Sequence, residues 1–522
     1  MRRPRSLEPA ELSGLRAPWA IVDAHVWTGD GGRHEAIAFG ADGRVLACGH
    51  NRAVTAALPR GAEIVDGRGA TVCPGFVDPH VHVRAAASAS LGIDASRAAG
   101  PADILTVVRD ACRERGDARG GSRDARGVRR DPRDGRGDAA AARRDWVTVV
   151  GADLGSPLAG QAPDRVAVDR VSGATPVRIR DRSGHAWLFN SAALATLGVD
   201  PAGAAPAGVM VERDADRSPT GFVADHVGWV GSRLGRVTDG ASLTEAVGRW
   251  SRRMARVGVV ALCDATATNG AAQARSLVRW RRCGALRQEI SFLSAPTARI
   301  DAHDRHRHAG VKFADPTDPA LRDALRRAAR TGLRVAVHAV TPEDVGAVLG
   351  AVRAQASMLR LEHAGFVPPD WIGAVRALGA TVVTHPGLIE TRGDAYLADE
   401  ELRPHDWLYR LRSWTDHGVP LAFASDAPFG PADPLAALRA AAHRRTAGGA
   451  LIGPREALAG EDALRALTVR AADCSGLGPL GYGRIRRGGP GAAVVLSHDP
   501  RDPLQLDELR LLATVIDGDV VD

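Results

Sequence analysis

The chain has 522 residues, of which 45% are hydrophobic and 25% charged, and its 68 basic residues exceed its 61 acidic residues by seven. This apolar content excludes a wholly disordered chain, and no apolar run reaches the roughly 18–20 residues that a membrane span requires. A charge excess this small does not favour nucleic-acid binding. The basic N-terminus has no unbroken apolar core, and the six cysteines show no CxxC spacing. We therefore expect no secretory signal and a cytoplasmic protein with reduced thiols.

Both ends of the chain have a β pattern. Residues 19–72 alternate apolar and polar residues in short runs, which predicts a small antiparallel β unit behind a flexible tail at residues 1–18. Residues 480–522 repeat the pattern in AAVVLSHD and LLATVIDGDVVD. We predict one β-sandwich built from both termini, with two unrelated β flaps as the alternative.

Between these ends, apolar strand-like runs alternate with amphipathic helical segments. From the second run onward their spacing is mostly about 20–30 residues, as expected for parallel βαβ units. This pattern predicts a (β/α)8 barrel over residues 73–479. A doubly wound open sheet is the alternative, but no GxGxxG turn supports it. The eight runs are 71–83, 259–265, 288–295, 310–313, 334–340, 359–365, 381–387 and 419–427.

The gap between the first two runs is too long for a single crossover. Within it, residues 113–145 are almost all Arg, Asp, Gly and Ala, which predicts a disordered loop. An RNA-binding segment is the alternative, although the interleaved aromatic residues of such segments are missing. Residues 146–250 regain apolar content, and we predict that they form an inserted cap.

The first run ends in His80-Val81-His82. In a strand, residues i and i+2 point to the same face, so the two imidazoles project together. Two neutral imidazoles at this spacing are half of a metal site.

Further candidate ligands end other runs. Lys312 ends the fourth run, His338 the fifth, His363 the sixth and Asp426 the eighth. Side chains at the carboxyl ends of barrel strands converge on one mouth. Each residue alone has a structural explanation, such as a buried hydrogen-bonded histidine or a helix cap. Their common register instead favours a joint metal site.

Lys312 is the only lysine in the chain, although 68 residues are basic. An ammonium group is a poor metal ligand, whereas a neutral lysine amine can add CO2 and form an anionic carbamate that bridges two cations. Arginine does not lose its proton and cannot do this. The alternative is an ordinary lysine whose ammonium reaches solvent.

Other polar residues form a second group of candidates. Those in the SGHAWLFN segment are predicted to contact the substrate or the developing oxyanion, with the fixing of a loop as the alternative, and those at the ends of the second and seventh runs are predicted to line the pocket or to orient ligands. They are His185, Asn190, Asp264 and His385. A histidine cluster at His303, His306 and His308 is interpreted as a solvated loop, because no strand end places it at the site.

Five segments, in this order, resemble the amidohydrolase superfamily of metal-dependent hydrolases: PGFVDPHVH, GVKF, VAVHA, LEHAG and FASDAP. The segments DRSGHAWLFNSAAL and SDAPFGPADPL are similar to its YtcJ-like group, which includes N-substituted formamide deformylases. The resemblance implies a barrel with a flanking sandwich. It also implies one metal at His80, His82 and Asp426, another at His338 and His363, and a bridging carboxylated Lys312. The short segment after Lys312 lacks the longer DG-containing loop of this group.

These observations predict a hydrolase that cleaves an amide, N-acyl amine or N-formyl amine by metal-activated hydroxide, with Asp426 as the base. Zinc is the expected ion, in one or two copies, with Mn, Fe, Ni and Co left open. The expected partner is a small amide-type substrate, with no nucleic acid and no membrane; a homodimer is left open. An inactive ligand-binding relative and a mononuclear deaminase or isomerase are the alternatives.

Overall fold

The computed structural model describes residues 12–521 except 32, 121–145, 185, 200–202, 204–208, 226–228, 235–239 and 353–356. The chain divides into two compact units. Unit 1 is formed by the chain up to Ala86 and from Val247 onward, and unit 2 by Ala87–Ala246. The six residues predicted as metal ligands all belong to unit 1.

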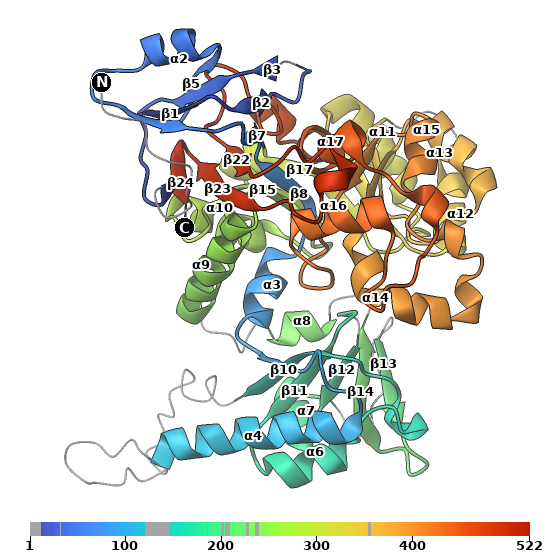
Figure 1. Ribbon diagram of the computed structural model, residues 1–522. Helices are drawn as coiled ribbons and strands as arrows, with labels where there is room; N and C mark the ends of the chain where they lie inside the picture. Colours follow the sequence, from blue (N-terminus) through green and yellow to red (C-terminus); the bar gives the residue numbers. More distant parts are fainter. Residues whose placement is uncertain are drawn as a thin grey trace. The chain divides into compact units, whose positions relative to one another are not determined.

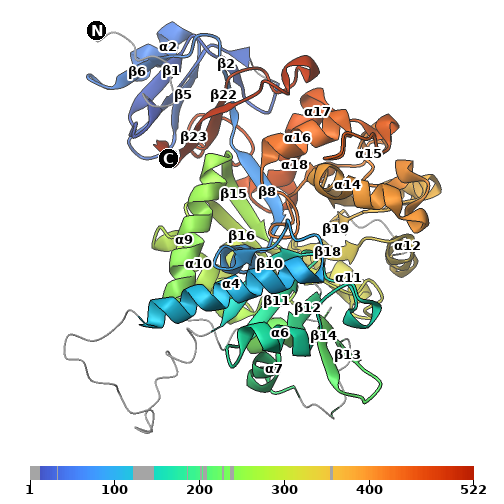
Figure 2. The same cartoon turned by 60° about the horizontal axis from the view of Figure 1, so that its bottom comes forward.

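Eight parallel strands form the barrel of unit 1 and follow one another in chain order around it (Figures 1 and 2). The first and last strands meet at the predicted ligands. The Asp426 N–H donates to the His80 carbonyl over 2.9 Å, and the His82 N–H donates to the Ala427 carbonyl over 2.9 Å. The predicted (β/α)8 class is thereby confirmed. The strands are β8 (Phe76–Val81), β15 (Val259–Asp264), β16 (Glu289–Ser294), β17 (His308–Phe313), β18 (Arg334–Ala339), β19 (Leu359–His363), β20 (Thr381–Thr384) and β21 (Leu421–Phe423).

The predicted first barrel strand, residues 71–83, is two strands. Its first part, β7 (Thr71–Pro74), pairs with strands of the sandwich, and only β8 enters the barrel. Gly75 separates them, where a Cβ atom would come within 2.3 Å of the Val260 side chain. A residue without a side chain is therefore required where the chain passes from the sandwich to the barrel.

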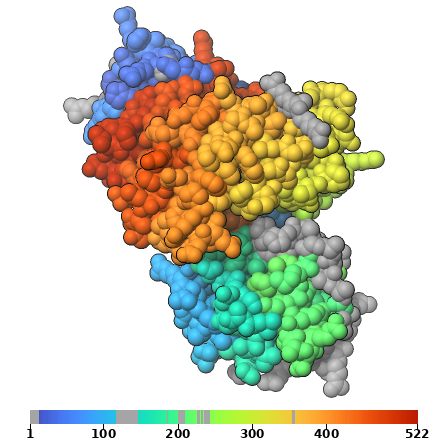
Figure 3. Space-filling view, turned by 90° about the vertical axis from the view of Figure 1, so that its right-hand side faces the viewer, coloured from blue at the N-terminus to red at the C-terminus, as the bar shows by residue number. Residues whose placement is uncertain are grey.

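Helices follow the strands and cover the outside of the barrel. Their apolar faces share one core with the outward side chains of the strands, as Leu321 does with Val335 and Leu361. The segments after β17 lie in chain order, yellow to red, across one face of unit 1 (Figure 3). Helix α2 (Asn51–Ala57) instead packs on strands of the sandwich.

In the described part of the chain, no helix combines the length and apolar character needed to cross a membrane. Apart from α2, the helices are α3 (Val83–Ala89), α9 (Gly240–Arg256), α10 (Ala271–Arg282), α11 (Leu321–Thr331), α12 (Pro342–Ala351), α13 (Ile372–Leu378), α14 (Gly387–Ala398), α15 (Arg412–Asp416), α16 (Pro434–His443), α17 (Gly460–Leu467) and α18 (Val469–Cys474).

Two sheets from both ends of the chain form the predicted sandwich (Figure 1). One has the order β5-β4-β1-β6 and the other the order β24-β23-β22-β7-β2-β3. Residues of both sheets, such as Ile37 and Val515, share one apolar core. The remaining strands are β1 (Trp19–Val22), β2 (His25–Trp27), β3 (Arg33–His34), β4 (Ala36–Phe39), β5 (Val45–Gly49), β6 (Glu63–Asp66), β22 (Ala493–Leu496), β23 (Leu511–Ile516) and β24 (Asp519–Val521).

Part of the predicted flexible tail is packed. Leu12 and Leu15 are 1% and 3% exposed and belong to the sandwich core. The Ala17 N–H donates to the Asp519 carboxylate over 3.0 Å. Residues 12–18 are therefore fixed by apolar contacts that their short sequence did not reveal, whereas residues 1–11 lie outside the described residues.

Unit 2 is a six-stranded sheet, β13-β14-β12-β11-β10-β9, with helices packed on it (Figures 1 and 2). It begins at residue 87, earlier than the predicted cap at 146–250, because β9 pairs with β10 and α4 packs on the same core. Helix α4 continues to Gly120, into the predicted loop at 113–145; residues 121–145 lie outside the described residues. The elements are β9 (Ile93–Asp94), α4 (Pro101–Gly120), β10 (Val147–Ala152), α6 (Arg165–Ser172), β11 (Val177–Asp181), β12 (Ala186–Phe189), α7 (Ser191–Leu197), β13 (Val209–Arg213), β14 (Pro219–Asp225) and α8 (Trp229–Leu234).

Candidate metal centre

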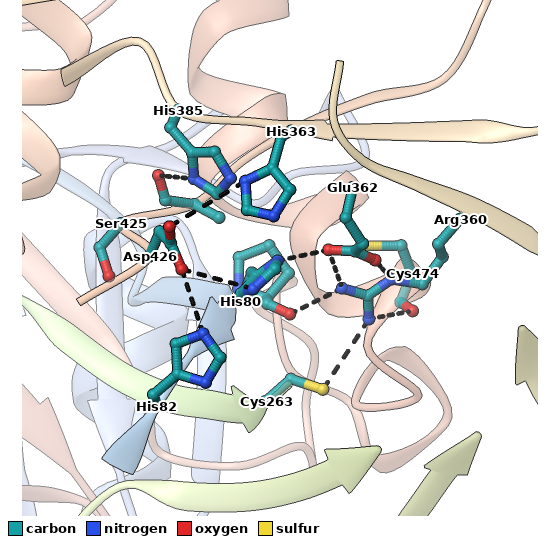
Figure 4. A network of polar contacts seen from close by, with 12 residues as sticks. His80, His82, Cys263, Arg360, Glu362, His363, His385, Ser425, Asp426 and Cys474 are labelled. Atoms are coloured by element: carbon teal, nitrogen blue, oxygen red, sulfur yellow. Dashed lines mark hydrogen bonds and ion pairs between the residues drawn. The ribbon is translucent and has the colours of Figure 1, made fainter. Parts of the chain in front are cut away.

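Three predicted ligands meet where the barrel closes. His80 is the last residue but one of β8, His82 follows this strand, and Asp426 follows β21. One ligand atom of each lies within 4.8 Å of the others. The Nε2 atoms of His80 and His82 lie 3.4 and 3.2 Å from Asp426 Oδ1 (Figure 4). The backbone hydrogen bonds that close the barrel therefore also set the distances within this group.

A second group shares His80. One ligand atom each of His80, His363 and His385 lies within 4.8 Å of the others, and all three side chains are buried. The ring centroids of His363 and His385 are 4.8 Å apart (Figure 4). His385 directly follows β20 and was predicted to line the pocket or to orient ligands; the geometry places it among the potential ligands themselves.

The chemistry of these donors fits a divalent cation. Nδ1 of His80 lies 2.5 Å from the Glu362 carboxylate, which only accepts, so this nitrogen carries the proton and the lone pair of Nε2 faces Asp426. His385 Nδ1 donates to the Ala424 carbonyl over 3.1 Å. Its Nε2 and Asp426 Oδ1 are buried and have no hydrogen-bond partner among the described residues. Buried lone pairs that converge without a donor are costly, and a cation satisfies them together.

Burial and neighbouring charges set the ionisation of the site. Burial, and then the Lys312 ammonium, lower the pKa of His80 to about 3, so its ring is neutral at physiological pH. Burial also lowers the pKa of His363 well below its usual value, with His338 and His385 adding to the effect. Burial opposes the ionisation of Asp426, but the His82 and His80 rings outweigh it and hold the pKa of this carboxyl below its usual range. Neutral imidazoles around an ionised carboxylate are the protonation states that bind a metal.

The backbone is strained at two of the ligands. His363 and Asp426 have φ angles of 70° and 57°, and Ala364 has 45°. A residue other than glycine adopts this left-handed conformation at a cost of about 1–3 kcal/mol. The Asp426 N–H bond to His80 and an Ala364 N–H bond to the Ala339 carbonyl, 2.9 Å long, help to hold these turns. The strain ends each strand abruptly beside the group of ligand atoms.

Lys312 and His338 lie on the inner face of the barrel. Phe313 and Val337 pack into the outer core, so their neighbours in the same strands point inward. Lys312 is 4% exposed, and its Nζ has no hydrogen-bond partner among the described residues. The His338 ring centroid lies 4.5 Å from that of His363. His338 belongs to neither group of mutually close atoms, so its role and the carbamate on Lys312 stay predictions.

Asp264 and Asn190, two of the second group of candidates, make structural contacts. Both carboxylate oxygens of Asp264 accept hydrogen bonds, from the Val83 N–H over 2.9 Å and the Thr266 N–H over 3.1 Å. Thr266 is in turn hydrogen-bonded to His82 Nδ1 over 2.9 Å, so Asp264 supports a ligand from behind. Asn190 is fully buried and caps α7, and its amide nitrogen donates to Ser172 over 3.0 Å.

In the described part of the chain, the histidine cluster at residues 303–308 does not join the site. His185 lies outside the described residues. His303 and His306 lie in a 3₁₀ turn, and His308 begins β17 and is hydrogen-bonded to Ser294 over 3.0 Å. None of these three belongs to a group of ligand atoms in the described part of the chain.

Sequence reasoning missed the buried residues that hold the ligands. Arg360 and Glu362 form an ion pair behind His80 (Figure 4). Asp78 accepts hydrogen bonds from the Ser425 N–H and hydroxyl, directly before Asp426. The available signal was charge at inward positions of strands whose other positions are apolar, as in LRLEH.

Comparison with known proteins decides the family. A model of the amidohydrolase family matches residues 63–522, which include every candidate ligand. The chain belongs to the amidohydrolase family. It is an enzyme that hydrolyses carbon–nitrogen bonds other than peptide bonds, as predicted.

This amidohydrolase has relatives over nearly its whole length. N-substituted formamide deformylase of Arthrobacter pascens is 27% identical, and the aligned region covers 95% of this chain and 97% of the relative. The amidohydrolase-like protein YtcJ of Bacillus subtilis (strain 168) is 23% identical, and the aligned region covers 87% of this chain and 89% of YtcJ. The predicted resemblance to this group is confirmed. The crystal structure of an uncharacterized metal-dependent hydrolase from Pyrococcus horikoshii has the same fold, with a TM-score of 0.67, 19% identity and coverage of 93% of this chain and 98% of that one.

Proposed function

We propose that this amidohydrolase hydrolyses the C–N bond of a small amide, N-acyl amine or N-formyl amine at a divalent metal centre, with zinc as the expected ion. One ion is held by His80, His82 and Asp426. The convergence of their ligand atoms on the buried Asp426 Oδ1, which has no hydrogen-bond partner among the described residues, is the observation that carries the proposal. The formamide deformylase relative supports an amide substrate, because the similarity spans nearly both chains.

A second ion has fewer ligands available. Nδ1 of His80 is committed to Glu362, so its single free lone pair serves one ion. A second ion would be held by His363 together with His338 or His385, and the carbamate of Lys312 would supply its anionic oxygen ligand. The sharing of His80 between the two groups is also the observation that favours the mononuclear alternative, a deaminase or isomerase. The number of metal ions bound per chain distinguishes the two-metal hydrolase from the mononuclear alternative.

The residues of the site divide the chemistry among them. A bound divalent cation lowers the pKa of a water molecule towards neutrality and polarises the substrate carbonyl. Ionised Asp426 takes a proton as water adds to the carbonyl carbon, and delivers it to the nitrogen as the C–N bond breaks. The His80 and His82 rings lie beside the Asp426 carboxylate, while Asp264 and Thr266 hold His82.

Purified protein is expected to contain zinc or another divalent metal by elemental analysis. It should release amines from a panel of N-formyl and N-acyl amines, lose this activity on dialysis against a chelator, and regain it on addition of zinc. A metal-replete protein that is inert on every amide, ester and lactam would instead support the ligand-binding alternative.

Metal loading is expected to depend on pH and CO2. Burial lowers the pKa of Lys312 to about 8, with Arg360 adding to the effect and Glu362 opposing it. Because only the neutral amine adds CO2, carbamate formation should increase as the pH rises through about 8. We expect bicarbonate to increase the zinc uptake of the apoprotein above this pH and to have little effect well below it. Uptake that is independent of bicarbonate at every pH would contradict the carbamate; Lys312→Met provides the baseline.

A further inference from the structure

A buried ion pair crosses the inside of the barrel. Arg360 and Glu362 lie two residues apart in β19 and are both fully buried. Leu359 and Leu361 pack into the outer core, so the charged pair points into the barrel. Arg360 Nε donates to Glu362 Oε1 over 2.7 Å, and a terminal guanidinium nitrogen donates to Oε2 over 3.2 Å.

The guanidinium of Arg360 also reaches other elements. It donates to the Pro79 carbonyl of β8 over 2.8 Å and to the Cys474 carbonyl at the end of α18 over 3.2 Å. Strands β8 and β19 are not neighbours in the barrel sheet, so these contacts span its interior. The first of them fixes the backbone directly before His80.

Glu362 holds the ring of the same histidine. Its Oε2 lies 2.5 Å from His80 Nδ1, so His80 sits between this pair and Asp426 (Figure 4). Both oxygens of the Glu362 carboxylate accept hydrogen bonds from Arg360. The carboxylate therefore accepts from Nδ1 and leaves the Nε2 lone pair directed towards Asp426. The His82 and His385 rings are instead bonded to neutral groups, the Thr266 hydroxyl and the Ala424 carbonyl.

Stability alone does not account for a buried pair. Taking two charges out of water is costly, and apolar side chains of similar volume often stabilise a fold equally well. We propose that Arg360 and Glu362 are positioning residues that hold the backbone and ring of His80 for cation binding, an inference that rests on the proposed metal centre. A hydrogen-bonded carboxylate behind a metal-binding histidine typically accounts for 10–100-fold in metal affinity.

A matched pair of double variants tests the orientation without leaving a buried charge. Arg360→Met/Glu362→Gln keeps an oxygen that accepts from His80 Nδ1, and Arg360→Met/Glu362→Leu removes it. Zinc affinity is measured by competition with a chromophoric chelator, and the thermal unfolding of the metal-free proteins by calorimetry. We expect the Leu variant to bind zinc about 10–100-fold more weakly than the Gln variant, with similar unfolding temperatures for the two. When Co(II) replaces zinc, the visible spectrum of the Leu variant should differ from that of the parent more than the spectrum of the Gln variant does.

A measurement on the parental protein covers the case in which the variants do not fold. Nitrogen NMR of the metal-free protein, with His80→Asn for assignment, should show His80 protonated at Nδ1. Protonation of His80 at Nε2, or equal zinc affinities for the two double variants, would overturn the positioning role of Arg360 and Glu362 but not the metal centre. A parental protein that binds no divalent cation would overturn the metal centre and this inference together.

Discussion

The Lys312→Arg variant is expected to fold, to bind less metal and to lose hydrolytic activity by at least about 10³-fold, since removal of even one charge-stabilising donor costs about 10²–10³-fold. The lysine amine forms an N–C bond to CO2 and releases a proton, which produces an anion. Arginine keeps its proton and places a permanent positive charge near Glu362 and Asp426, the two carboxylates whose charges act on Lys312. Metal content, kcat/KM and thermal unfolding of the metal-free protein measure the three parts of the prediction.

Two comparisons make this result specific. Arg326→Lys, on the exposed surface of α11, controls for an exchange of guanidinium and amine away from the site. Lys312→Ala leaves space for a small carboxylate, so added acetate or propionate should restore part of its metal binding and activity, whereas Lys312→Arg should not respond. Hydrolysis by Lys312→Arg at the parental rate would show that the carbamate is wrong.

The barrel could be predicted because its strands combine two signals. Outward residues such as Val335 and Val337 pack beneath helices, which produces apolar runs at regular spacing. Ligand candidates such as His338 and His363 stand at the ends of these runs, and parallel strands bring their carboxyl ends together. The regular spacing of the strands along the chain was therefore enough to predict both the fold and most of the candidate site.

Spacing carries no information about contacts across the barrel or within an irregular layer. Arg360 and Glu362 look like the polar half of an ordinary alternating strand, and only the folded barrel shows that they face His80. Likewise, β9 is too short to be recognised as a strand in the sequence, and only its pairing with β10 in the folded chain identifies it. For Asn190, the sequence left substrate binding and a structural role open, and only the fold shows that its side chain caps α7.

Asp426→Asn is expected to separate activity from stability. Loss of the proton-accepting carboxylate should lower kcat/KM by about 10²–10⁴-fold, and loss of its charge should weaken metal binding further. The metal-free protein should unfold at the same or a higher temperature, because an amide N–H can donate to the His80 or His82 Nε2 lone pair that the carboxylate oxygen faces at 3.4 and 3.2 Å.

Asp416→Asn is the matched control, since this carboxylate is exposed at the end of α15. It should leave metal content, kcat/KM and unfolding unchanged. Calorimetry of the metal-free and zinc-loaded proteins then gives the decisive comparison: zinc should raise the unfolding temperature of the parent much more than that of Asp426→Asn. Equal stabilisation of both by zinc would mean that the cation binds elsewhere, and Asp426 would keep only its role in closing the barrel beside His80.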